Sequence, residues 1–290
     1  MVLGIVVGLG AGIGIFQGVK ALLADPPAKG DGGYPLVSSV PGQRATIWAV
    51  GDGEASDAGR AVADRIASAP FDRLLYLGDV YGSGSAEDFA ENYAPTYGRL
   101  ARRTAPTPGN HDWPNHETGY DRYWRRALGR QRAAAWYAFS AGGWRILSLN
   151  SETDHAAKSP QGRWLHSQLR EPGTCRIAFW HRPRFSAGRQ GDQPDTASLW
   201  NALRGHATIV LGGHDHSMQR LRPKGTITQF VSGAGGRSHY GVDRDDRRLA
   251  FSDDRTYGAL RLVLRPGSAA FAFVAADGRV LDSGTVRCRR

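Results

Sequence analysis

Two histidines separated by a single residue follow a short apolar stretch of the chain. Ile209–Leu211 is typical of a buried strand, and the glycine pair Gly212–Gly213 ends it. Because alternate residues of an extended chain project to the same side, His214 and His216 can face the same space beyond this strand. Such a pair can bind a metal ion, although histidines are also common in loops that bind no ligand. The assignment therefore depends on whether other strand ends supply further donors.

Carboxylate, amide and imidazole side chains follow four other extended stretches. In α/β folds the carboxyl ends of the strands assemble the functional site, so these side chains are expected to converge with the two histidines. Taken singly, an aspartate or asparagine after glycine is often only a turn former. A whole series at successive strand ends favours a metal site instead. The candidate donors are Asp52, Asp79, Asn110, His181, His214 and His216.

Strands and helices alternate over the first two thirds of the chain and then give way to strands. Helical spacing occurs at 57–68, around 87–91, and at 159–169 and 196–203. Strands are predicted at 45–50, 74–77, 136–141, 145–149 and 177–180, with Gly142 and Gly143 as a hairpin turn. Prolines at 106 and 108 make the stretch 104–108 an edge strand or loop entry. Further strands are predicted at 226–231, 260–264, 270–274 and 280–281. This order predicts an α/β fold of two packed sheets with helices outside.

Composition indicates one large domain with a basic surface. The chain has 290 residues, of which 41% are hydrophobic, so it can bury a sizeable core. Its net charge of +10 comes almost wholly from arginine and favours anionic ligands. No run of clustered basic residues with interleaved aromatics is present, so nucleic-acid binding is not expected.

The N-terminal region differs from the rest of the chain. Residues 2–19 contain no charged side chain, and residues 25–43 are rich in proline, glycine and serine. We expect a signal peptide or membrane anchor at 1–24, a flexible linker at 25–43 and the folded domain at 44–290. The two cysteines, Cys175 and Cys288, are either one disulfide or two buried thiols. Export would place the protein in an oxidising compartment, so we expect the Cys175–Cys288 disulfide.

The ordered motifs resemble those of a known family. Gly51-Asp52, Gly78-Asp79 with Tyr81, Gly109-Asn110-His111-Asp112, Trp180-His181 and Gly213-His214-Asp215-His216 resemble the motif set of the calcineurin-like metallophosphoesterases. The branch that the chain most resembles is the purple acid phosphatase-like one, in its short bacterial form, over about residues 46–236. The resemblance implies a four-layer αββα sandwich of two mixed sheets with flanking helices. It also implies two divalent or trivalent metal ions, Fe, Zn or Mn, at the sheet ends.

The resemblance also assigns the donors to the two metals. Asp52 and His216 are expected to bind the first metal, and Asp79 to bridge both. The ligands expected for the second metal are Asn110, His181 and His214. A metal pair can hold a bridging hydroxide that attacks a phosphoric ester in line with its leaving group.

Two further residues are expected to act on the leaving group. His111 follows a metal ligand and would protonate the departing alkoxide, a general-acid effect of about 100-fold to 10,000-fold. Asp112 is expected to orient His111, and Asp215 to point away from the metals.

The chain departs from the family pattern around the first metal. Purple acid phosphatases carry a tyrosine ligand three residues after the bridging aspartate, whereas Tyr81 is only two residues after Asp79. Glu54 stands where many relatives carry a histidine ligand, so it competes with Tyr81, and the identity of the metal stays open. Arg182 and Arg237 are candidates for binding the substrate phosphate, because guanidinium binds phosphate in a bidentate way.

These expectations define a function and two alternatives. The chain is expected to be a di-metal phosphomonoesterase, secreted or anchored through residues 2–24, acting on a small phosphate ester outside the cytoplasm. A phosphodiesterase acting on nucleotides or lipid head groups shares the same core. The alternative of another class is an anchored, non-catalytic binding protein on the same fold. The oligomeric state is not fixed by the sequence.

Overall fold

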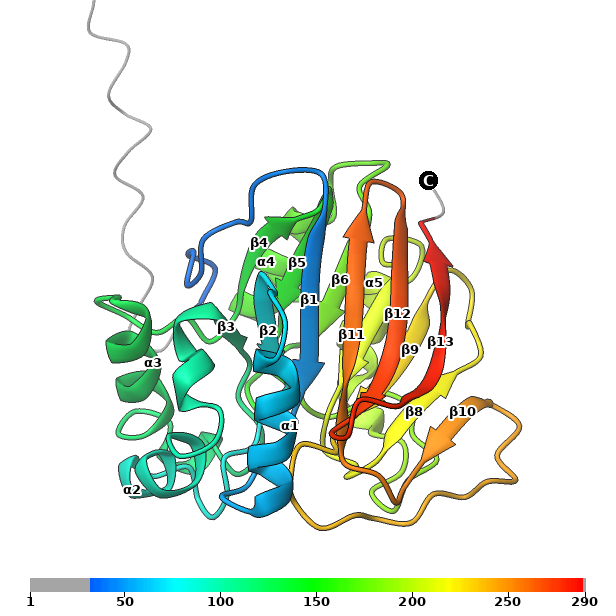
Figure 1. Ribbon diagram of the computed structural model, residues 1–290. Helices are drawn as coiled ribbons and strands as arrows, with labels where there is room; N and C mark the ends of the chain where they lie inside the picture. Colours follow the sequence, from blue (N-terminus) through cyan, green and yellow to red (C-terminus); the bar gives the residue numbers. More distant parts are fainter. Residues whose placement is uncertain (1–31, 289–290) are drawn as a thin grey trace, which may run out of the picture.

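Two β-sheets pack face to face, with helices on both outer faces (Figure 1). The computed structural model describes residues 32–288. The six-stranded sheet has the order β13(Val280–Arg287), β12(Ser268–Ala275), β11(Gly258–Arg265), β1(Ala45–Val50), β2(Arg73–Tyr76), β3(Thr104–Pro106). The seven-stranded sheet has the order β10(Leu249–Asp253), β8(Met218–Leu221), β9(Thr228–Ser232), β7(Ile209–Gly212), β6(Arg176–Phe179), β5(Trp144–Ser148), β4(Tyr137–Ala141). The predicted α/β sandwich of two mixed sheets with flanking helices is confirmed.

The strands that lead to the candidate donors are parallel within each sheet. In one sheet β1, β2 and β3 run parallel, and in the other β5, β6, β7 and β9 do. Parallel strands bring their carboxyl ends to one edge, which is where loops of different sequence position meet. The proline-containing β3 lies at the edge of its sheet, as predicted.

Three hydrophobic clusters hold these layers together. The largest lies between the sheets and includes Ile47, Leu75 and Ile177. Outside the six-stranded sheet, α1(Asp57–Ala67), α2(Ala86–Asp88) and α3(Tyr120–Leu128) lie with a π-helical turn Phe89–Tyr93 and 3-10 segments Gly98–Arg103 and Trp113–Asn115. Outside the seven-stranded sheet lie α4(Pro160–Gln168), α5(Ala197–Leu203) and the 3-10 segment Pro194–Thr196. The central strands are thus buried on both faces, which explains their continuous apolar sequences.

Local sequence signals predicted most of these elements. The hairpin between β4 and β5 has positive φ at both Gly142 (56°) and Gly143 (82°), as a tight two-residue turn requires. The elements α3, β8 and β10 were not predicted from the sequence. In α3 only Tyr120 and Trp124 are buried, so arginines mask its apolar stripe.

The start of the described chain packs against the domain. Leu36 is fully buried and Val37 nearly so, and the Val40 N–H donates to the Ser140 carbonyl over 2.8 Å. The flexible linker predicted at 25–43 is therefore wrong in its second half, because its apolar side chains join the core between the sheets. The signal peptide or anchor predicted at 1–24 lies outside the described residues. Between residues 32 and 288 no helix is long and apolar enough to cross a bilayer.

A disulfide joins Cys175 and Cys288, with 5.6 Å between their Cα atoms. It connects the start of β6 to the end of β13 and so links the two sheets near the C-terminus. The paired cysteines lie 113 residues apart. On the chain-entropy account, closing a loop of that length stabilises the fold by about 4 to 5 kcal/mol.

Candidate metal centre

The candidate donors meet at the carboxyl ends of parallel strands from both sheets. Asp52 follows β1 and Asp79 follows β2, while His181 follows β6 and His214 follows β7. All four side chains are buried. The candidate donors form two clusters, and we name each cluster after its central residue.

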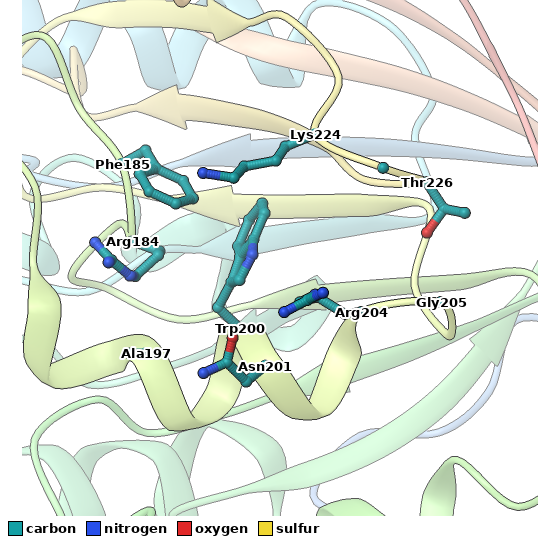
Figure 2. Close-up of a pocket in the computed structure, with 10 residues that line it drawn as sticks. Arg184, Phe185, Ala197, Trp200, Asn201, Arg204, Gly205, Lys224 and Thr226 are labelled. Atoms are coloured by element: carbon teal, nitrogen blue, oxygen red, sulfur yellow. The ribbon is translucent and has the colours of Figure 1, made fainter.

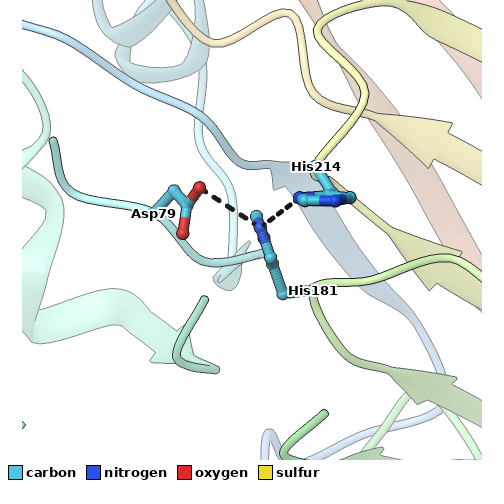
Figure 3. Close-up of side chains that lie close together, drawn as sticks. All are labelled: Asp79, His181 and His214. Carbon is cyan, nitrogen blue, oxygen red and sulfur yellow. Dashed lines mark hydrogen bonds and ion pairs between the residues drawn. The ribbon is translucent and has the colours of Figure 1, made fainter. Parts of the chain in front are cut away.

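The His181 cluster consists of Asp79, Asn110, His181 and His214. The His181 Nε2 atom lies 3.2 Å from Asp79 Oδ2 and 3.1 Å from His214 Nδ1 (Figure 3). The same nitrogen lies 3.1 Å from Asn110 Oδ1. One ligand atom each from Asp79, His181 and His214 falls within 4.8 Å of the others, so the three can bind a single ion.

The Tyr81 cluster consists of Asp52, Tyr81 and His216. The Tyr81 hydroxyl donates to Asp52 Oδ1 over 3.1 Å and lies 2.6 Å from His216 Nε2. Asp52 Oδ1 and His216 Nε2 are 3.6 Å apart. Carboxylate, phenol and imidazole therefore converge on one point. The two clusters touch where the His214 N–H donates to Asp52 Oδ2 over 2.9 Å.

Backbone carbonyls orient two of the imidazoles. His181 Nδ1 lies 2.8 Å from the Leu77 carbonyl, and His216 Nδ1 lies 2.7 Å from the Ser238 carbonyl. A carbonyl accepts only from N–H, so each Nδ1 carries a hydrogen and each Nε2 is the nitrogen that faces the cluster. This is the arrangement by which proteins orient histidines that bind metals.

Three donors occupy strained backbone conformations. Asp52, Asp79 and His214 have φ values of 60°, 62° and 69°, in the left-handed region that non-glycine residues seldom adopt. Each such residue costs about 1 to 3 kcal/mol, and they persist where the surrounding structure holds them for function.

The glycines before the donors allow close approach of the loops. A Cβ on Gly78, which has φ of 93°, would lie 2.7 Å from His181 Nδ1. A Cβ on Gly109 would lie 2.1 Å from Asp79 Oδ1. Glycine before each of these loops is thus a packing requirement of the centre.

Burial and neighbouring charges shift the pKa values of the donors strongly. Burial alone would lower the pKa of His181, but the adjacent Asp79 carboxylate raises it to about 10. Burial and the positive His181 lower the pKa of His214 to about 2, and burial lowers that of His216 to about 4. Burial raises the pKa of Asp52 well above its usual value. Perturbations of this kind concentrate at functional sites.

His111 lies at the mouth of the centre. Its backbone N–H donates to Asp79 Oδ1 over 2.9 Å, and its Nδ1 lies 2.6 Å from the Gly82 carbonyl. The ring packs against Tyr81, with 4.5 Å between ring centroids. Unlike the donors it is only partly buried, so it can reach a bound molecule from the solvent side.

Asp112 does not orient His111 in the way expected. Its carboxylate accepts from the backbone N–H groups of Gly109, Asp79 and Val80, at 2.8, 2.8 and 2.9 Å. These bonds fasten the His111 loop to the Asp79 loop. The expectation was wrong because three backbone donors surround the buried carboxylate, and the Gly82 carbonyl orients the imidazole instead.

Tyr81 and Glu54, the two rivals for the first metal, occupy different places. Tyr81 lies inside its cluster, whereas the Glu54 carboxylate pairs with Arg237. The Arg237 guanidinium lies 4.7 Å above the Tyr81 ring, and its backbone N–H donates to the Asp52 carbonyl over 3.0 Å. Arg237 is therefore at the rim of the centre, on the side of Asp52.

Arg182 is engaged elsewhere in the loop after β6. Its Nε lies 3.0 Å from both carboxylate oxygens of Glu152. Asp215 also turns aside, because its carboxylate accepts from the Ser186 hydroxyl and from the Gln190 N–H. It thus lies apart from the donors on either side of it, as expected.

Two residues that shape the candidate centre were not predicted from the sequence. The Tyr240 ring stacks on His216 with 3.9 Å between centroids, and no local signal marks that tyrosine. Asp88 accepts from the N–H groups of Gly82, Ser83 and Ser85 and so fixes the loop that follows Tyr81. Its capping box with Ser85 was detectable as Ser followed by Asp three residues later.

Fold and site together define a protein built to hold metal ions at the facing ends of two sheets. The family model described as calcineurin-like phosphoesterase matches residues 42–218, more than half of the chain. The chain belongs to this family.

Individual proteins and solved structures are also similar to this chain. A protein named probable purple acid phosphatase 20, from Arabidopsis thaliana, is 24% identical over 224 residues, 68% of this chain and 48% of the relative. The chain thus spans about half the length of that curated relative. Among solved structures, purple acid phosphatase PPD1 from yellow lupin matches with a TM-score of 0.64 and 16% identity, over 88% of this chain and 55% of the other. GAP50, described as the anchor in the inner membrane complex of Plasmodium, matches with a TM-score of 0.69 and 14% identity, over 86% and 90% of the two chains.

Proposed function

We propose that this chain is a di-metal phosphoesterase that hydrolyses phosphate monoesters outside the cytoplasm. The observation that carries the proposal is the convergence of seven donor side chains into two adjoining clusters with His111 at their mouth. Membership of the calcineurin-like phosphoesterase family supports the reaction class.

The donor chemistry fits two metal ions. The His181 cluster offers two imidazoles, an amide oxygen and a carboxylate, and the Tyr81 cluster offers a carboxylate, a phenol and an imidazole. Such mixtures suit Fe, Zn or Mn better than Mg or Ca, which prefer oxygen alone. We assign Asp79, whose two oxygens face different neighbours, as the bridging ligand. Bound metals would neutralise phosphoryl charge and supply a nucleophile at neutral pH.

His111 is the residue proposed to protonate the leaving group. Its backbone bond to Asp79 ties it to the metal ligands, and the Gly82 carbonyl holds its Nδ1. The Nε2 atom has no partner among the contacts of residues 32–288, which leaves it available for the ester oxygen. A proton held there offsets the negative charge that develops on a poor leaving group.

Arg237 is the proposed contact for non-bridging phosphate oxygens. It lies at the rim over Tyr81, and its pairing with Glu54 through Nη1 leaves further N–H donors on the same guanidinium. Arg182, which is bound through Nε to Glu152, is the weaker candidate for this role.

The Cys175–Cys288 disulfide supports a location outside the cytoplasm, where oxidising conditions maintain such bonds. The uncharged stretch 2–19 supports export or anchoring as the route. Mass spectrometry of the mature N-terminus in the native host separates the two: cleavage before residue 32 indicates a signal peptide, and an intact terminus indicates an anchor.

The test of the reaction compares two substrates on the full chain loaded with Fe, Zn or Mn. We expect hydrolysis of p-nitrophenyl phosphate at least about tenfold faster, in kcat/KM, than of bis(p-nitrophenyl) phosphate. Faster hydrolysis of the diester would make the chain a phosphodiesterase. Metal binding without hydrolysis of either ester would contradict the proposed enzymatic activity.

A non-catalytic binding protein is the second candidate, and the similarity to the Plasmodium anchor protein is the observation that favours it. That likeness concerns the fold alone. A retired site would be expected to lose donors, whereas both clusters here retain theirs, and this favours the enzyme.

A further inference from the structure

A second pocket lies on the outer face of the seven-stranded sheet and contains no residue of either metal cluster. It encloses about 710 Å³ and is built around Trp200, so we call it the Trp200 pocket (Figure 2). Trp200 and Arg204 come from α5 and its C-terminal end, Arg184 and Phe185 from the loop after β6, and Lys224 from the turn between β8 and β9.

The aromatic wall of the pocket is fixed. Phe185 and Trp200 meet edge to face with 5.0 Å between ring centroids, and Trp200 is buried in the outer cluster of this sheet. The Phe185 backbone is held at both ends by the buried Gln229, whose side chain accepts from its N–H and donates to its carbonyl. A ligand would therefore meet a preformed surface.

Three basic side chains without a carboxylate partner in the described part of the chain line this pocket. The Arg184 guanidinium lies 4.5 Å and the Lys224 ammonium 4.3 Å from the centre of the same Phe185 ring. Figure 2 shows Arg184, Lys224 and Arg204 around the Trp200 ring. In residues 32–288 none of these three pairs with a carboxylate, and no acidic residue lines the pocket.

Arg248, a nearby arginine, differs because carboxylates neutralise its charge. Arg248 lies 5.8 Å from the Phe185 ring, but it pairs with Asp192 at 2.8 Å and with Asp246 at 2.6 Å. Basic side chains that line one pocket favour an anionic ligand there. Unlike Arg248, Arg184 and Lys224 therefore keep donors that an anionic ligand could use.

We propose that the Trp200 pocket binds a phosphate-bearing small molecule of about nucleotide size. Its phosphate would lie among Arg184, Lys224 and Arg204, where guanidinium groups provide bidentate donors. Its apolar or ring portion would lie against Phe185 and the accessible edge of Trp200. A volume of about 710 Å³ is within the range of small-molecule sites, about 300 to 1,000 Å³, and exceeds what one phosphate ion needs.

The test measures binding to the full chain by calorimetry with metals removed by a chelator, so that the metal centre does not contribute. The probes are adenosine monophosphate, inorganic phosphate and adenosine. We expect the monophosphate to bind most tightly, phosphate to bind more weakly and adenosine not to bind. Equal affinities for adenosine monophosphate and phosphate would mean that the pocket binds only the anion. That result would contradict a ligand of nucleotide size. No binding of either would overturn the proposal altogether.

Matched charge reversals locate the binding. Lys224→Glu and Arg184→Glu should each weaken monophosphate binding by about tenfold or more, equivalent to about 1.4 kcal/mol. Arg102→Glu, on the opposite outer face of the sandwich, should leave it unchanged. Equal losses in all three variants would indicate a general charge effect and contradict the site. Hydrolysis of p-nitrophenyl phosphate by the metal-loaded Lys224→Glu chain should match that of the unmodified chain, so failure of the proposed reaction and failure of this site are distinguishable.

Discussion

The His181 cluster and the Tyr81 cluster adjoin each other but are built differently. The centre of the first is an imidazole two residues after the end of β6, a strand with neighbours on both sides. The centre of the second is a phenol on the loop after β2, and its place depends on the contacts of that loop. The first cluster is therefore set by the sheet, and the second by a loop that differs in length from the family pattern.

The difference bears on which metal each cluster prefers. Two imidazoles, beside the amide oxygen of Asn110 and the carboxylate of Asp79, give the His181 cluster the softer donor set, which would suit Zn or another divalent ion. Carboxylate and phenol oxygens give the Tyr81 cluster the harder set, which suits trivalent iron. On the proposed two-metal centre, the donors of the Tyr81 loop would therefore influence which ion the first site binds.

Removing the centre of the sheet-built cluster should have the largest effect. His181→Ala is expected to lose one bound metal and to lower kcat/KM for p-nitrophenyl phosphate by about a thousandfold or more, because the phosphoryl group loses one of two charges that stabilise it. His166→Ala, an exposed histidine on α4, should change neither quantity. Retention of both metals in His181→Ala would contradict the assignment of that cluster.

His111 contacts one residue of each cluster, Asp79 and Tyr81. Its replacement should have the next largest effect on hydrolysis. His111→Ala is expected to keep both metals but to slow hydrolysis of alkyl phosphates by about 100-fold or more. The loss should be much smaller for p-nitrophenyl phosphate, whose leaving group needs no proton. An equal loss for both substrates would mean that His111 has a structural role.

Substitutions of Tyr81 and Glu54 test which of the two side chains binds a metal at the Tyr81 cluster. Tyr81→Phe removes only the hydroxyl between Asp52 and His216 and should lower the affinity for one metal by about tenfold to 100-fold. Glu54→Gln should keep that affinity, since Glu54 pairs with Arg237 outside the cluster. Titration of each variant with Zn²⁺ or Fe²⁺ measures this, and the reverse order would make Glu54 the ligand.

Replacing Asp88 should have the smallest effect of these changes, a modest loss in the free energy of unfolding. Burial would raise its pKa, but the N–H groups of Ser83, Ser85 and Gly82 outweigh that effect and lower the pKa to about 2. Because this lies below the ordinary value of 3.8, the stabilisation is fully present above pH 3.8 and disappears as the pH falls through 2. Asp88→Ala should cost about 1 kcal/mol in urea unfolding at pH 7, as loss of a helix cap does.

The control for this loop is Glu87→Ala, an exposed acid in the same helix with no role in the capping box. It should leave the unfolding midpoint within experimental error of the unmodified chain. A loss as large as that of Asp88→Ala would show that charge at the helix start, and not the fixed loop, provides the stability.

The convergence of the donor side chains could be predicted from the sequence because parallel strands impose the geometry. Asp52, Asp79, His181 and His214 each follow a strand within a few residues, so their convergence follows from the sheets alone. Gly142 and Gly143 likewise specify their turn locally.

Other features depend on segments that meet only in three dimensions. The contacts of Asp112 with three backbone groups, and the stacking of Tyr240 on His216, join loops far apart in sequence. Leu36 and Val37 pack because the core has room for them, which a composition rich in proline and glycine conceals. The Trp200 pocket combines a helix, a loop and a turn, none of which carries a motif.

The most direct test of the two-cluster centre is anomalous diffraction from crystals of the metal-loaded chain. We predict two metal peaks, one bound by Asp79, Asn110, His181 and His214, and the other by Asp52, Tyr81 and His216, with Asp79 between them. A single peak, or a second metal bound by Glu54 with the Tyr81 hydroxyl turned away, would contradict the account.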